Sequence, residues 1–161
     1  MMRLPDSARR RLETEGYREI PDSVLAQIEP WLRLAPGVSL VWTAAGVLLQ
    51  SPWVLFGLVP FCLMGAITRG HPFDVFYNRG VRRRTGAPTL PPYPAPRRFA
   101  FLVSAVWVLA LAIGYTIGGG GWVDVLGAFL VLLRLVHLTT GYCVASHLHC
   151  RIFGPSEPYR S

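Results

Sequence analysis

Apolar residues are gathered into two long uncharged stretches of the chain. No charged side chain occurs in residues 34–68, and none occurs in residues 99–123. About 20 apolar residues in a helix cross the hydrocarbon core of a bilayer. The first stretch has 35 residues and is interrupted by Gln50, Ser51 and Pro52, a turn that a helix interior does not tolerate well. It therefore predicts two short membrane-spanning helices joined by a tight turn.

The second half of the chain is divided in the same way by four glycines, Gly118 to Gly121. The stretch before them predicts a third spanning helix, and a less apolar stretch after them predicts a fourth. We expect an all-α membrane protein with four transmembrane helices arranged as two hairpins. The expected spans are residues 34–49, 53–68, 99–117 and 122–143. The four-helix domain covers residues 34–153, with a connecting loop at 69–98 and a C-terminal tail at 154–161.

The first 33 residues are charged throughout and lack the apolar core of a cleavable leader. Within this N-terminal segment, Val24, Ile28, Trp31 and Leu32 fall on one face of a helix. The pattern predicts a short amphipathic helix lying on the membrane, with Trp31 at headgroup level. A disordered leader is the alternative.

Composition and charge support a membrane location and give it a direction. Of the 161 residues, 52% are hydrophobic and 16% are charged, against about 25% charged in soluble domains. Loop 69–98 holds seven arginines, whereas the two short turns hold no basic residue. The positive-inside rule then places this loop and both termini on the cytoplasmic side of the membrane.

The basic residues also indicate which partners to expect. All 16 are arginines and the net charge is +7, but they flank apolar segments and are not interleaved with aromatic residues, so nucleic acid is not expected. Arg82, Arg83 and Arg84 are expected to meet anionic lipid headgroups. His71 and Asp74 in the same loop are candidate interaction residues.

The predicted fourth helix carries unusual polar residues. Arg134, His137 and Gly141 are spaced to share one face, which should point inward because an ionisable group in the membrane is costly. We expect Arg134 to reach backbone carbonyls or Asp74 on the cytoplasmic side. The alternative is an arginine that serves topology only. His137 is also a candidate ligand for a pigment.

Cys143, His147 and Cys150 would share a face if the fourth helix continued through them. Cysteine and histidine are zinc ligands, but this set supplies three at most. Alternatively, Cys143 is a reactive thiol, with His147 favouring its thiolate and Cys150 as the resolving partner. His147 is a second candidate pigment ligand. No cofactor or catalytic constellation is firmly indicated.

Several short motifs together resemble a bacterial family of four-helix membrane proteins catalogued as a domain of unknown function. They are His71-Pro72-Phe73 with Tyr77 and Arg79, Ala95-Pro96 with Arg98-Phe99-Ala100, and Gly141-Tyr142-Cys143. The resemblance covers roughly residues 35–153. It implies a second cysteine three residues after the first, then an acid, and association with thioredoxin-like or rhodanese-like proteins. Here Ser146 and His147 stand at those two positions, so Cys143 cannot close a disulfide within the motif.

Three functions are compatible with this sequence. The first is a non-enzymatic accessory subunit of an electron-transfer, respiratory or photosynthetic membrane complex, with loop 69–98 as its docking surface. Small residues that let helices approach closely support it, namely Gly46, Gly57, Gly65, Gly114 and Gly127. The second is a membrane thiol-redox or sulfur-handling module that uses Cys143. The third is an oligomeric transporter.

Overall fold

The structure is a computed structural model, and in its described part all regular secondary structure is helical. It describes residues 6–15, 17, 20–68, 74, 77–81, 83 and 88–154. In order, the helices are α1 Asp6–Glu15, α2 Asp22–Leu32, α3 Leu34–Leu48, α4 Pro52–Ile67, the π-helical turn η1 Tyr77–Val81, α7 Ala95–Thr116, α8 Gly121–Thr140 and α9 Val144–Phe153.

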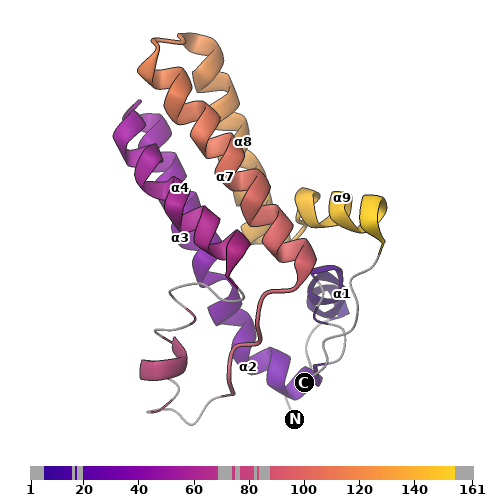
Figure 1. Cartoon of the computed structure of the whole chain (residues 1–161). Helices are drawn as coiled ribbons and strands as arrows, with labels where there is room; N and C mark the ends of the chain where they lie inside the picture. Colours follow the sequence, from indigo (N-terminus) through magenta and orange to yellow (C-terminus); the bar gives the residue numbers. More distant parts are fainter. Residues whose placement is uncertain are drawn as a thin grey trace.

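Two antiparallel helix hairpins, α3–α4 and α7–α8, lie side by side (Figure 1). The most extensive packing is between α4 and α7, and α3 packs on α8. The shared core is apolar, with Leu58 and Cys62 of α4 against Val108 of α7 and Leu130 of α8. Both interhelical turns lie at one end of the bundle, whereas α1 and α9 lie at the other end.

Glycines allow the two hairpins to approach closely. A Cβ added to Gly65 would come within 2.8 Å of the ring of Phe101, and one added to Gly127 would come within 2.8 Å of Val47. Real Cβ atoms do not reach such distances, so these positions exclude any larger residue without a shift of the neighbour. The small residues noted in the sequence are therefore used for packing inside the chain.

Three helices are long and apolar enough to cross a membrane. They are the continuous stretch Asp22–Leu48, Ala95–Thr116 and Gly121–Thr140, and α4 is a shorter apolar helix. Large apolar side chains on these helices point outward, for example Val41, Val106 and Val125, each more than 60% exposed. Exposed apolar surface of this extent is unfavourable in water. The helices fit a membrane protein.

The N-terminal helix differs from the sequence prediction. Leu25, Ile28 and Leu32 of α2 are at most 3% exposed and pack in a small core with Leu12 and Tyr17. The expectation that this apolar face lies on the membrane is wrong, because the protein itself covers it. Trp31 likewise contacts the ring of Tyr77, at 4.8 Å between ring centroids. The charged helix α1 packs on this apolar face through Leu12. The sequence pattern does not reveal this contact.

The fourth long helix ends earlier than predicted. It stops at Thr140, because Gly141 adopts a left-handed conformation with φ 72°, a C-terminal cap that glycine accepts at low cost. The chain then turns and forms α9, which lies across the end of the bundle (Figure 1). The predicted continuation of α8 to residue 143 is therefore wrong. In turn, α7 begins at Ala95, four residues before the expected start.

Candidate functional site

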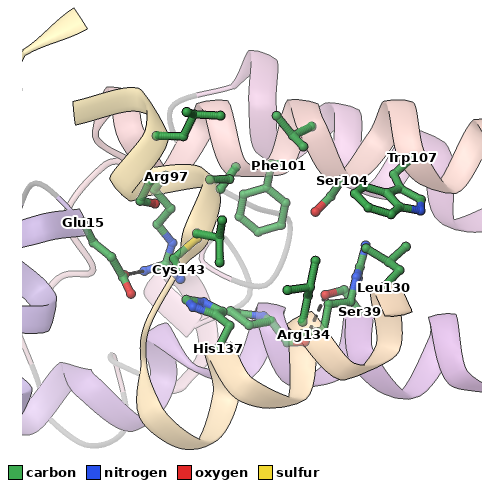
Figure 2. A pocket seen from close by; sticks show the side chains of 18 residues that line it. Glu15, Ser39, Arg97, Phe101, Ser104, Trp107, Leu130, Arg134, His137 and Cys143 are labelled. Atoms are coloured by element: carbon green, nitrogen blue, oxygen red, sulfur yellow. Dashed lines mark hydrogen bonds and ion pairs between the residues drawn. The ribbon is translucent and has the colours of Figure 1, made fainter. Parts of the chain in front are cut away.

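A cavity of about 280 Å³ lies where α3, α7 and α8 meet the start of α9. Its walls are mainly apolar, with Phe101, Trp107 and Leu130 among them (Figure 2). The polar residues that line it are Glu15, Ser39, Arg97, Ser104, Arg134, His137, Cys143 and Ser146. Three residues singled out from the sequence, Arg134, His137 and Cys143, therefore line the same cavity.

At one end of the cavity Arg97 is buried in a closed polar cluster. Its guanidinium pairs with the carboxylate of Glu15 at 3.3 Å and donates to the hydroxyl of Tyr17 at 3.3 Å and to the carbonyl oxygen of Leu32. It also lies 4.5 Å from the ring centroid of Tyr93. Burial raises the pKa of Tyr17 to about 12, against the opposing effect of the Arg97 charge. The cluster ties α1, α2 and α7 together.

Asp74 belongs to this same cluster. It is 6% exposed, and its carboxylate is hydrogen-bonded to Tyr93. The prediction that Asp74 could pair with Arg134 is therefore wrong, because the carboxylate is held beside Arg97. Of the other loop residues singled out from the sequence, Arg83 is exposed, whereas His71, Arg82 and Arg84 lie outside the described residues.

At the other end, Arg134 is buried, and no carboxylate among the residues that the structure describes pairs with it. Its side chain enters the cavity from α8, about 20 Å along the helix from Gly121, and is 9% exposed. One guanidinium nitrogen contacts the sulfur of Cys62 at 4.0 Å. In the described part of the chain, nothing accepts a hydrogen bond from its Nε. Among the described residues, no backbone carbonyl accepts a hydrogen bond from this side chain, contrary to the sequence prediction.

His137 lines the cavity one helical turn beyond Arg134 (Figure 2). Ser39 faces them from α3, and its hydroxyl donates to the carbonyl of Pro36 at 2.9 Å. Ser104 of α7 contributes a further hydroxyl to the wall. This end of the cavity therefore combines one cation, one imidazole and two hydroxyl groups in an apolar surround.

Cys143 lies at the N-terminal cap of α9, and its side chain lines the cavity. Ser146, one turn into the helix, is 1% exposed, and its hydroxyl is 3.4 Å from the carbonyl of Pro96. Burial raises the pKa of the Cys143 thiol, while hydrogen bonds from Ser146 act in the opposite direction. The thiol is therefore protonated at neutral pH.

The expected contact between His147 and the thiol of Cys143 is not formed. Its Nδ1 is 3.0 Å from the backbone carbonyl of Cys143, and its ring stacks on Tyr142 with centroids 4.2 Å apart. These contacts fix the first turn of α9. The sequence prediction assumed that the fourth helix continues through Cys143 and His147. Because the helix breaks at Gly141, Cys143 instead lies at the cap of α9.

Cys150 is too far from Cys143 to resolve a disulfide in this conformation. They are seven positions apart, and at the rise of a helix this corresponds to roughly 10 Å along the axis, whereas bridged cysteines have Cα atoms less than about 7 Å apart. In the described ranges, no group of three or more His, Cys, Asp or Glu side chains is placed to hold a metal ion. The candidate metal set of Cys143, His147 and Cys150 is thus not assembled.

Two residues of the motif that opens α7 have structural contacts. Arg98 donates to the carbonyls of Ala66 at 2.8 Å and Ile67 at 3.2 Å, and so caps the C-terminus of α4. Phe99 packs against Phe153 and His149 of α9, with ring centroids 6.3 and 5.4 Å away. The motif therefore holds α4 and α9 in place around the cavity.

The chain matches a family described as a domain of unknown function (DUF4395) over residues 29–153. The chain belongs to this family. No curated protein and no solved structure matches it. The matched region includes every cavity residue except Glu15, so the cavity is built almost entirely by the family domain.

Sequence reasoning missed several residues of the site in this family member, among them Glu15, Arg97, Ser104 and Ser146. Glu15 and Arg97 were counted only as charges flanking the spans, and Ser146 only as a missing cysteine. Arg97 did carry a signal, since it directly precedes an apolar span beside a second arginine. Its partner Glu15 is 82 residues away, and no local pattern connects the two.

Proposed function

We propose that the chain crosses a bacterial inner membrane four times, through α3, α4, α7 and α8. The 16-residue α4 packs along α7 for much of its length, so both helices would cross the same bilayer. Because α1 and α9 lie at the end opposite the two turns, an even number of crossings is required. The arginine distribution supports a cytoplasmic location for this end.

A reporter experiment tests this topology. We expect a fluorescent reporter that matures only in the cytoplasm to be bright after residue 161. A reporter active only outside the cytoplasm should report when inserted at Gln50 or Gly119. A periplasmic signal from the C-terminal fusion would contradict the four-span arrangement.

We further propose that the protein is a membrane thiol module that carries a thiol compound on Cys143 as a mixed disulfide. The observation that carries this proposal is the position of Cys143 at the start of α9, with its sulfur in the cavity and Ser146 one turn away. In the family pattern a second cysteine stands where this chain has Ser146. A single thiol at this position can accept a cargo, but it cannot expel that cargo by itself.

The proposed reaction is a thiol–disulfide exchange. The sulfur of Cys143 attacks a small disulfide, forms a new S–S bond to one half, and releases the other half as a thiol that takes the Cys143 proton. No net oxidation occurs. Because burial raises the pKa of Cys143, attack by this thiol is slow. A later thiol preferentially expels the partner of lower pKa, so it releases the cargo and leaves Cys143 in the new disulfide. This favours a carrier over a rapid oxidoreductase.

Intact-mass measurement after incubation with cystamine tests the thiol proposal. We expect the full-length protein in lipid nanodiscs to gain one cysteamine adduct at Cys143. Cys143→Ser should lose it, and the matched control Cys150→Ser should keep it. An adduct that persists in Cys143→Ser would contradict the proposal.

The variant Ser146→Cys sharpens this test. Two cysteines at the start of a helix, three residues apart, should form a disulfide and release the cysteamine. We expect the adduct to be stable in the natural sequence and transient in the variant. Equal adduct lifetimes in the two proteins would show that position 146 does not act on the thiol.

The roles of accessory subunit and oligomeric transporter stay predictions. The glycines that supported the first, such as Gly65 and Gly127, are used for packing within the chain. Much of the arginine-rich loop lies outside the described residues. Neither role has a structural observation of its own.

A further inference from the structure

We propose that the cavity binds a small organic acid, with the acid group against Arg134 and an apolar body against the surrounding walls. The inference goes beyond the proposed thiol chemistry, because binding of this kind does not require Cys143 to react. It depends on three features of the cavity: its charge, its size and the nature of its walls.

The charge argument starts from the burial of Arg134. A guanidinium stays protonated under all ordinary conditions, and a buried charge is costly unless it is paired. In the described part of the chain, no carboxylate pairs with Arg134, and its Nε has no acceptor. The carboxylate of Glu15 also lines the cavity, but it is paired with Arg97. An anion from outside the chain would supply the missing partner.

The size of the cavity restricts that anion. A volume of about 280 Å³ corresponds to roughly nine water volumes of about 30 Å³ each, so an acid of similar size to octanoate fits. The cavity is only partly enclosed, so its volume limits the part of the ligand that lies inside it. The space is also much greater than a chloride ion needs.

The walls indicate what the rest of the ligand is like. Phe101, Trp107 and Leu130 line the cavity together with Arg134, and Ser104 contributes a hydroxyl group to the lining (Figure 2). Such walls favour an apolar body over a second charge. From Arg134 the cavity extends toward Cys143 at its other end, so an acid held here would reach toward the thiol.

The test compares octanoate with octanol, which has the same chain but no charge. We measure binding to the full-length protein in nanodiscs of zwitterionic lipid by isothermal titration. Octanoate should bind at least about tenfold more tightly than octanol. Arg134→Gln should abolish this difference, and Arg134→Lys should retain part of it. Equal affinities in the natural protein, or no saturable octanoate binding, would overturn the proposal.

Further variants separate loss of the site from loss of the fold. Ser104→Phe fills part of the cavity while the sequence keeps Arg134, and it should also abolish octanoate binding. Arg151→Gln removes an exposed arginine outside the cavity and should leave binding unchanged. Tight octanoate binding to Ser104→Phe would place the acid elsewhere and overturn the assignment.

Two competing ligands and the thiol reaction are distinguished in the same assay. If chloride displaces octanoate as effectively as hexanoate does, the site binds inorganic anions and the organic-acid assignment is wrong. A phospholipid that stays with the natural protein but not with Arg134→Gln would assign the site to a lipid headgroup and overturn it too. Cys143→Ser should bind octanoate normally, so failure of the thiol proposal and failure of acid binding are seen separately.

Discussion

Two buried arginines line the same cavity, but their surroundings are opposite. Arg97 is 5% exposed and Arg134 is 9% exposed. The first is enclosed by the carboxylate of Glu15, the hydroxyl of Tyr17 and the carbonyl of Leu32. The second contacts the sulfur of Cys62. Burial alone therefore does not tell what a charged side chain does.

The difference separates stability from ligand binding. A fully satisfied buried cation joins the elements that satisfy it, and here these are α1, α2 and α7. An unsatisfied one costs free energy in the folded protein. Such an arrangement persists at sites where a ligand completes it. We therefore expect Arg97 to be needed for folding and Arg134 for function, and the following variants test this division.

Arg97→Gln should have the largest effect on stability. It leaves the Glu15 carboxylate buried without its cation, and removing one partner of a buried pair costs about 3–5 kcal/mol. The free energy of unfolding, measured by denaturant titration of the purified protein in detergent, should fall by this amount. A loss below about 1 kcal/mol would remove the distinction between the two arginines.

High pH should weaken the same cluster without any mutation. The pKa of Tyr17 is raised by burial to about 12, whereas an exposed tyrosine titrates near about 10. The folded protein therefore keeps a proton that the unfolded chain loses, and stability falls as the pH rises from 10 to 12, by about 1.4 kcal/mol per pH unit for one proton.

The variant Tyr17→Phe is the control for this pH dependence. It should be less stable at neutral pH, because the hydrogen bond from Arg97 is lost, but its alkaline slope should be shallower by one proton. Burial also raises the pKa of Tyr93, so some alkaline dependence should remain. An unchanged slope in Tyr17→Phe would show that this hydroxyl does not titrate in the folded state as expected.

Glu15→Gln should cost less than the loss of Arg97, about 2 kcal/mol. The charge of Arg97 would lose its carboxylate but would keep the carbonyl of Leu32 and the ring of Tyr93. Thermal unfolding in detergent measures the change. Glu13→Gln, which alters an exposed pair with Arg9 on the same helix, is the matched control and should change stability by less than about 0.5 kcal/mol.

Arg134→Gln should have the smallest effect on stability, within about 1 kcal/mol of the natural protein in the absence of ligand. The substitution removes a charge that the described residues leave unpaired, so little stabilising interaction is lost. The same titration as for Arg97→Gln gives the comparison. A loss of several kcal/mol would mean that Arg134 supports the fold and would reverse the division drawn above.

Sequence patterns were sufficient for the long apolar helices. Uncharged runs, Pro52 and the four glycines placed α3, α4, α7 and α8 within a few residues, because helix-forming apolar segments are long and uniform. Helix ends were less predictable. Gly141 was taken as part of the inward face, although glycine near a polar helix end is also a common C-terminal cap. For that reason the expected contact between His147 and the thiol of Cys143 was wrong.

The sequence by itself determined where apolar helices form, which family the chain resembles and that the first three spans contain no acid to pair with Arg134. These are local or compositional properties, and they can be recognised without knowing which residues are neighbours in space. Only the tertiary structure decided that Glu15 reaches Arg97 across 82 residues, that α2 is covered by protein, and that Cys143 and Arg134 share one cavity. Such contacts depend on how helices pack and turn, and a single sequence carries no separate record of them.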